Sequence, residues 1–247
     1  MLKWLVPPIL ACVLSASARA ADLRIVAPNA VREVVTDAAE RYERASGNRT
    51  VLSWSGSEAI AKRIGEGEVF DVVLNTPQNL DIFAKAGKIM PSTRRDFAKS
   101  GIGIAVRAGQ PRLDVSNEEA LRKALLDAKS IGISSGPSGR YVAELFQRLG
   151  VADKLQSKIK QPPSGTQIAD LLSRGEVELG FQQISELQHA RGVEYLGPMP
   201  VGLQSYTIWS GAVHSAAIDA AAGRTFLNTL TASDSATVIR NAGMEPM

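Results

Sequence analysis

Short apolar runs alternate along this chain with segments whose apolar residues recur at helical spacing. In the first such pair, residues 23–27 (LRIVA) form an apolar run and residues 31–45 place Val31, Val34, Val35, Ala38, Ala39 and Tyr42 on one helical face. Further strand-like runs are residues 51–54, 70–74, 102–106, 130–133, 178–182 and 206–213, and further helical segments are 58–64, 77–86, 118–128, 140–149, 168–173, 216–230 and 236–241. This order predicts an α/β fold, with a mostly parallel sheet covered by helices on both faces.

Two of the predicted strand regions, residues 101–106 and 205–213, bracket a central block of about a hundred residues, the size of an ordinary domain. If both cross between two lobes, residues 21–100 plus 205–247 form lobe 1 and residues 101–204 form lobe 2. Such a chain closes like a jaw about its two hinge crossings. A single doubly wound domain built from the same elements is the alternative.

The first twenty residues have the pattern of a cleaved signal peptide. Lys3 is followed by an apolar run from Leu5 to Leu14, and the segment ends in Ala18-Arg19-Ala20. We expect cleavage after Ala20 and export to the periplasm. A membrane anchor is the alternative, but the run is shorter than the roughly 20 residues that a spanning helix needs.

Composition excludes several kinds of site once residues 1–20 are set aside. Cys12 is the one cysteine, so the remaining chain has no disulfide or thiolate ligand. Removal of Lys3 and Arg19 lowers the basic residues from 28 to 26 against 25 acidic residues, so the net charge falls from +3 to +1. We therefore expect no nucleic-acid partner. With only His189 and His214, and no phosphate- or dinucleotide-binding motif, we expect no metal and no cofactor.

Four loops that follow strands and precede helices combine small polar residues with glycine or proline: residues 28–30, 55–57, 134–140 and 163–166. Backbone N–H groups and the positive end of the helix dipole make such loops suited to anions. In open α/β sheets these loops lie at the carboxyl ends of the strands, where ligands bind. Ordinary helix capping is the alternative reading of each loop.

Within these loops and at one strand end we identify the candidate ligand-binding residues. Arg140 stands out, because a cation at a helix start opposes the dipole unless a carboxylate or an anionic ligand pairs with it. A solvated surface arginine is the alternative for Arg140, and local loop capping is the alternative for the strand-end amides. The candidates are Asn29, Ala30, Gly56, Ser57, Ser138, Gly139, Arg140 and Gln183, with Gln182 beside the last.

Carboxylates near these loops are candidate acid–base groups. Glu58, Asp71 and Glu186 lie close to them in sequence. Glu58 also matches a capping box with Ser55, which would give it a purely structural role. If the protein is an enzyme, we expect Glu58 or Glu186 to be its catalytic base, provided that the site raises the pKa of that carboxyl.

Several segments resemble the periplasmic molybdate-binding protein family, and the resemblance extends over nearly the whole chain after residue 20. They are Leu52-Ser53-Trp54-Ser55-Gly56-Ser57-Glu58-Ala59-Ile60-Ala61-Lys62-Arg63-Ile64, Phe70-Asp71-Val72-Val73-Leu74, Gly136-Pro137-Ser138-Gly139-Arg140-Tyr141 and Val177-Glu178-Leu179-Gly180-Phe181. The resemblance implies a type II periplasmic binding-protein fold with two α/β lobes joined by two hinge crossings. It also implies delivery of a solute to the membrane subunits of an ABC transporter.

Three positions depart from the oxyanion contacts of that family. Ala30 stands where the first loop has a serine, Gly56 replaces one of the paired serines before Ser57, and Gln183 stands at a late tyrosine. The run from Gly180 to Leu187 (GFQQISEL) resembles a divergent branch that includes the periplasmic aconitate isomerase. Two functions therefore stay open. One is a solute-binding protein for a small carboxylate or oxyanion, with a di- or tricarboxylate favoured over molybdate, and the other is an isomerase that moves a proton along the allylic system of aconitate.

Overall fold

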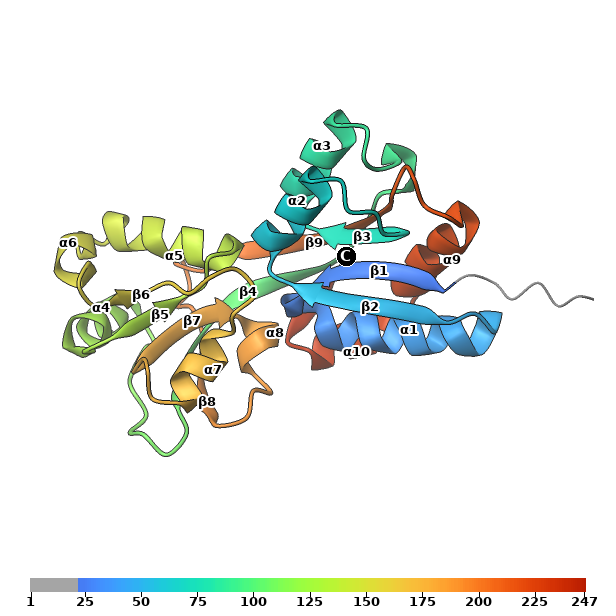
Figure 1. Ribbon diagram of the computed structural model, residues 1–247. Coiled ribbons are helices and arrows are strands. Elements are labelled where there is room, and N and C mark those ends of the chain that lie inside the picture. The colour runs from blue at the N-terminus through green and yellow to red at the C-terminus, as the bar shows by residue number, and fades with distance from the viewer. Residues whose placement is uncertain (1–21) are drawn as a thin grey trace, which may run out of the picture.

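The computed structural model describes residues 22–247 (Figure 1). The predicted signal peptide at residues 1–20 lies outside the described residues. Within the described part, no helix is both long and apolar enough to cross a membrane.

Ten strands and ten α-helices make up the described chain, mostly in alternation. The strands are β1 (Leu23–Pro28), β2 (Thr50–Ser55), β3 (Val72–Asn75), β4 (Arg95–Arg107), β5 (Ile131–Ile133), β6 (Ile159–Lys160), β7 (Leu179–Gln183), β8 (Val193–Pro198), β9 (Tyr206–Val213) and β10 (Met244–Pro246). The helices are α1 (Arg32–Ser46), α2 (Ser57–Gly65), α3 (Pro77–Lys85), α4 (Glu118–Asp127), α5 (Pro137–Arg148), α6 (Ala152–Leu155), α7 (Ile168–Ser173), α8 (Ile184–Leu187), α9 (Ala220–Leu230) and α10 (Ser235–Asn241). Short 3-10 helices cover η1 (Asn29–Val31) and η2 (Pro91–Thr93). Every strand and helix predicted from the sequence is present, most of them with shifted ends.

The strands form one mixed sheet in the order β2-β1-β3-β9-β4-β7-β5-β6, with β8 and β10 also paired to β4. β1 is parallel to β2 and β3, and β5 is parallel to β6 and β7. β9 is antiparallel to β3 and β4, and β4 is antiparallel to β7, β8 and β10. The prediction of a mostly parallel sheet is therefore wrong, because the two long central strands run against their neighbours.

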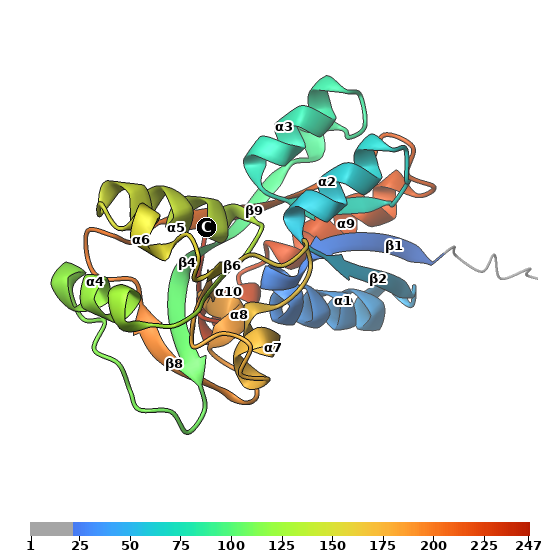
Figure 2. The ribbon, with the colours of Figure 1, turned by 60° about the vertical axis from the view of Figure 1, so that its left-hand side comes forward.

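The long strand β4 belongs to two parts of this sheet. Its residues 95–101 pair with β9, and its residues 102–106 pair with β7. We call the strands from β2 to β9 with residues 95–101 the first half of the sheet, and residues 102–107 with β5 to β8 the second half. The change of partner falls at the predicted hinge, and Figures 1 and 2 show the helices gathered around the two halves separately.

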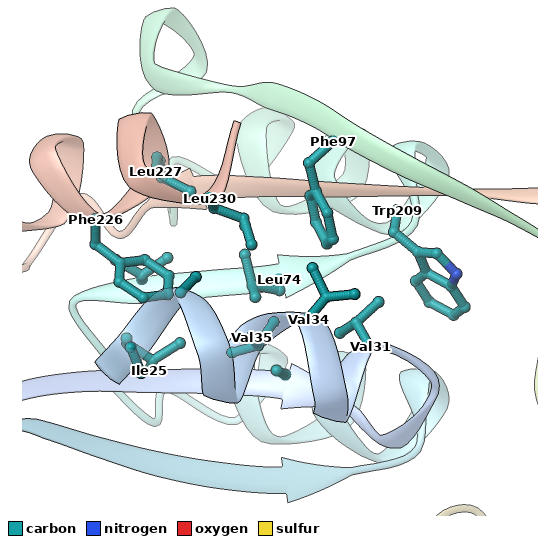
Figure 3. Close-up of a cluster of buried hydrophobic side chains, with 14 of the residues drawn as sticks. Ile25, Val31, Val34, Val35, Leu74, Phe97, Trp209, Phe226, Leu227 and Leu230 are labelled. Atoms are coloured by element: carbon teal, nitrogen blue, oxygen red, sulfur yellow. The ribbon is translucent and has the colours of Figure 1, made fainter. Parts of the chain in front are cut away.

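Each half buries apolar side chains on both faces of the sheet. Successive strand residues point to opposite faces, so in β1 Ile25 packs toward α1 and α9 (Figure 3). The next residue, Val26, packs toward α2 and α3 on the other face. In β4 the same alternation sends Ile104 toward the core of α4 and α5 and Ala105 toward α7 and α8. Two separately packed halves allow one to move against the other without breaking a shared core.

Two helix starts differ by three or four residues from the expected positions, for local reasons. α5 begins at Pro137 rather than residue 140, because proline is well accommodated in the first turn of a helix. α9 begins at Ala220 rather than residue 216, where the Asp219 carboxylate accepts a hydrogen bond from the Ala222 N–H at 2.9 Å. Arg140 is consequently the fourth residue of its helix.

Candidate functional site

A pocket lies between the two halves of the sheet, where strand ends and helix starts from both halves meet. Its cavity volume is about 40 Å³, which leaves room for a few water molecules, so the cleft is closed. All four loops singled out in the sequence contribute to the lining. The lining residues are Pro28, Asn29, Ala30, Gly56, Ser57, Ser134, Ser135, Gly136, Pro137, Ser138, Ser164, Gly165, Thr166, Gln167, Gln182, Gln183, Glu186 and Trp209.

The helix starts at this pocket have no side-chain cap from the preceding residue, and a loop serine accepts from the third residue of α2 and of α5. η1, α2 and α5 follow Pro28, Gly56 and Gly136, and none of these residues caps its helix with a side chain. By contrast, Thr76 and Asn117 cap α3 and α4 away from the pocket. The first N–H groups of a helix have no acceptor within it, so uncapped starts directed at a cavity can bind anion oxygens.

Serine hydroxyls add donors beside these helix starts. Ser57 and Ser138 are buried, and the Ser138 hydroxyl lies 2.9 Å from that of Ser134. Gly139 does not line the pocket. Its N–H donates to Ser134 Oγ at 3.1 Å, and a Cβ atom at residue 139 would lie 1.6 Å from the Ser134 carbonyl oxygen. Gly139 therefore lets the loop fold tightly enough for the hydroxyls of Ser134 and Ser138 to meet.

Closure depends on a close approach of the loop 163–166 to the start of α2. A Cβ atom on Gly56 would lie 2.2 Å from Ser164 Oγ and 2.5 Å from the backbone nitrogen of Gly165. Ser164 Oγ accepts from the Ala59 N–H at 3.2 Å, and Asn29 Nδ2 donates to the Gly165 carbonyl at 3.2 Å. The hydroxyl that Gly56 lacks is thus replaced by one from the opposite half.

Arg140 and Glu58 form an ion pair across the rim of the cleft rather than inside the pocket. Their side chains are 54% and 39% exposed, and neither residue lines the pocket. The capping box expected for Glu58 is wrong: α2 begins one residue later than that box requires, with Gly56 at its N-cap, and the Glu58 carboxylate pairs with Arg140 instead. An exposed pair of this kind contributes little stability but joins the two halves.

Glu186 is the one ionisable side chain among the described residues that line the pocket. Part of the residue faces an adjoining groove, but its carboxyl group is surrounded by protein, and this desolvation raises its pKa to about 7. Hydrogen bonds from Gln167, from Gln182 and from the Gln183 backbone lower the pKa, as does the charge of Arg32, without offsetting the burial. The carboxyl group therefore changes its charge near neutral pH.

The amides around Glu186 are held by the backbone and by one another. Gln182 Oε1 accepts from the Ile168 N–H at 2.8 Å, and Gln182 Nε2 donates to Gln167 Oε1 at 3.1 Å. These bonds orient both amides toward Glu186. Gln183 points its side chain to the hinge instead, where its amide oxygen accepts from Thr207 Oγ1 at 2.8 Å and its nitrogen donates to the Ser100 and Gly101 carbonyls at 3.1 and 3.2 Å.

The adjoining groove continues from Glu186 to solvent and carries the nearest cation. Arg32 lines it, with its guanidinium 4.5 Å from the centre of the Trp54 ring and Nη2 donating to Asn29 Oδ1 at 2.9 Å. His189 also lines it and lies 3.0 Å from Glu33 across the cleft. The groove has a volume of about 620 Å³, so it offers space that the pocket lacks.

The remaining sequence candidates lie elsewhere. Asp71 accepts hydrogen bonds from the Arg24 and Ile218 N–H groups, and His214 is buried near it, away from the pocket. Within residues 22–247 no three His, Cys, Asp or Glu side chains are grouped to hold a metal ion. Sequence reasoning missed Gln167 and Trp209 in the pocket. Gln167 directly follows a predicted loop, whereas Trp209 lies inside an apolar strand and gives no signal.

Comparison with known proteins identifies relatives over the whole described chain. The bacterial extracellular solute-binding protein family matches residues 23–245. Aconitate isomerase from a Pseudomonas species is 31% identical over 231 residues, covering 91% of this chain and 88% of that protein. The molybdate-binding protein ModA of Azotobacter vinelandii is 23% identical over 191 residues, covering 75% and 74% of the two chains. The predicted family resemblance is confirmed.

Solved structures agree in fold. The periplasmic molybdate-binding protein of Azotobacter vinelandii superimposes with a TM-score of 0.78 at 19% identity, covering 90% of this chain and 98% of that one. The sulfate-binding protein SubI from Mycobacterium tuberculosis gives 0.73 at 17% identity, covering 92% and 87%. These matches confirm the predicted type II binding-protein fold.

Gly56→Ala tests whether the loop contact controls closure. We expect roughly 5- to 150-fold weaker binding of trans-aconitate or molybdate, whichever the protein binds, because overpacking of about 1–3 kcal/mol opposes the closed cleft. Ligand-free stability should change little, since an open cleft relieves the clash. Gly65→Ala is the control, because a Cβ atom there has no neighbour within 4 Å. Equal affinity of both variants, measured by calorimetry, would contradict this account of closure.

Glu186→Gln tests the raised pKa through stability. The folded pKa of about 7 exceeds the reference value of 4.5, so between these pH values the folded state holds more protons than the unfolded state. The free energy of unfolding should therefore fall as pH rises through this window, by up to about 3 kcal/mol. Urea unfolding at pH 5 and pH 8 should show this loss in the wild type and not in the variant. If the free energy of unfolding changed equally with pH in the wild type and the variant, the Glu186 carboxyl would be exposed to water rather than buried.

Proposed function

The chain belongs to the bacterial extracellular solute-binding protein family, and on that premise we propose that it is an aconitate isomerase built on a binding-protein scaffold. The observation that supports this proposal most strongly is Glu186, whose carboxyl lies in the ligand cleft and has a pKa of about 7. An ordinary anion binder gains nothing from an acid in its pocket, because a carboxylate repels the ligand. A proton-transfer enzyme needs a base of this strength. The similarity to the Pseudomonas enzyme supports the same function.

Substrate binding follows from the donors around the pocket. Carboxylate oxygens of aconitate would accept from the uncapped starts of α2 and α5 and from the Ser57 and Ser138 hydroxyls. The pocket is too small for all three carboxylates in its closed form. We place the remaining part of the ligand in the adjoining groove, where Arg32 supplies the positive charge that the pocket lining lacks.

The reaction is a proton shift along an allylic system. The Glu186 carboxylate takes a proton from the CH₂ carbon of trans-aconitate, and the negative charge spreads over the allylic carbons and the attached carboxylates. The protonated Glu186 then returns the proton to the other end of the system, so the double bond moves and cis-aconitate forms. Hydrogen-bond donors at the helix starts stabilise the charge that develops on the carboxylate oxygens.

Glu186 fits this role better than Glu58 because of their surroundings. Desolvation makes Glu186 a stronger base than a carboxylate in water, and at neutral pH a large fraction is still ionised. Glu58 is paired with Arg140 at the rim. In this arrangement the Glu58–Arg140 pair joins the proposed lobes, residues 21–100 plus 205–247 and residues 101–204, when the cleft closes.

Glu186→Gln should abolish aconitate turnover while binding is kept or tightened, since the amide cannot accept a proton from carbon and no longer repels the ligand. Glu58→Gln is the matched control and should retain turnover. In the wild type, kcat/KM should rise with pH through about 7, as the free Glu186 ionises. We would measure turnover by absorbance and binding by calorimetry for all three proteins. Loss of turnover in Glu58→Gln with full activity in Glu186→Gln would reverse the assignment.

The second candidate is a passive binding protein that delivers a small oxyanion or carboxylate to an ABC transporter. Neutral donors around the pocket favour it, since hydroxyls and helix starts suffice for a fully ionised oxyanion. Under this function molybdate should raise the melting temperature strongly and aconitate should be bound without conversion. The predicted signal peptide agrees with a periplasmic location for either function.

A further inference from the structure

Trp209 carries a buried donor without an acceptor at the edge of the pocket. The residue lies in β9, is 2% exposed and lines the pocket. Its indole Nε1 is buried and has no hydrogen-bond partner among residues 22–247. Figure 3 shows the ring beside Val31 and Phe97 at the end of the hydrophobic core, with its nitrogen on the side away from both.

Burying the indole N–H without an acceptor destabilises the protein unless a ligand in the pocket provides one. A buried donor without an acceptor destabilises the folded state, and such groups are rare in folded proteins. A phenylalanine would keep an aromatic ring against the core without leaving a donor unpaired. The nitrogen is thus of use only when an acceptor atom enters the pocket.

The chemistry of the missing acceptor is restricted. An indole N–H can only donate, so the atom opposite it must carry a lone pair. The surrounding helix starts and serine hydroxyls also favour negative charge. An ionised carboxylate or an oxyanion meets both conditions, whereas an ammonium group meets neither.

We infer that Trp209 is a ligand-binding residue whose indole N–H donates to an oxygen of the anion in the closed cleft. The inference rests on the proposed function only for the choice of aconitate as the probe. β9 runs between β3 and β4, so the donor is fixed by the sheet rather than by a loop. Trp209 therefore specifies where one oxygen of the ligand must lie.

Indole ¹H–¹⁵N spectra of exported protein test this directly. Cleavage at the predicted site removes Trp4 and leaves Trp54 and Trp209, hence two indole signals. Trp54→Phe assigns them by removing one. Saturation with trans-aconitate should move the Trp209 signal downfield, as expected for a new hydrogen bond to oxygen. An unmoved Trp209 signal at saturation would overturn the inference and assign the N–H to a structural water.

A second measurement uses Trp209→Phe, which keeps an aromatic ring against the core. Affinity for the bound anion should fall about tenfold or more, the scale of a hydrogen bond to a charged group, while the melting temperature of the free protein is kept. Wild-type affinity in a folded variant would overturn the inference. Should molybdate bind and aconitate not, the proposed function fails, and the same two measurements with molybdate decide the role of Trp209. Binding of neither anion would overturn both.

Discussion

The close contact between Gly56 and the Ser164–Gly165 loop is the constraint on which the site depends. It joins two separately packed halves at a point where any side chain on residue 56 would collide with the opposite loop. With the halves in contact, uncapped helix starts from both surround one small pocket. Glu186 lines this pocket, and desolvation by the surrounding protein is the largest cause of its raised pKa. The contact therefore completes the anion site beside the buried carboxyl.

An anion site beside a buried carboxyl explains how a binding-protein scaffold can support proton transfer, although its sequence carries no metal-binding or nucleophile motif. In the closed cleft, the Gln167 and Gln182 amides fix its position while burial strengthens it as a base. The Arg140–Glu58 ion pair joins the two halves at the rim of the cleft. The charged residues that stand out in the sequence thus hold the halves together, whereas the buried Glu186 is the proposed base.

The sequence predicted the fold well because apolar periodicity and strand–helix order are local signals. It missed β6, β8 and β10, which are short or lie at edges, and it missed the antiparallel direction of β4 and β9, which local pattern does not encode. Loops carrying Ser57, Ser138 and Ser164 were found from composition. Which of Glu58 and Glu186 enters the pocket depends on how two halves that are distant in sequence meet. The role proposed for Trp209 depends on its indole N–H being buried at the pocket without a hydrogen-bond acceptor. Neither property has a signature within a short stretch of chain.

The central claim is that the buried Glu186 carboxyl makes this solute-binding cleft an isomerase. Proton NMR of aconitate solutions with a catalytic amount of the wild-type protein tests it most directly, starting in one sample from the trans isomer and in the other from the cis isomer. The account predicts that both samples reach the same ratio of isomers, over many turnovers per protein molecule. Spectra that stay unchanged in both samples while calorimetry shows that aconitate binds would contradict it.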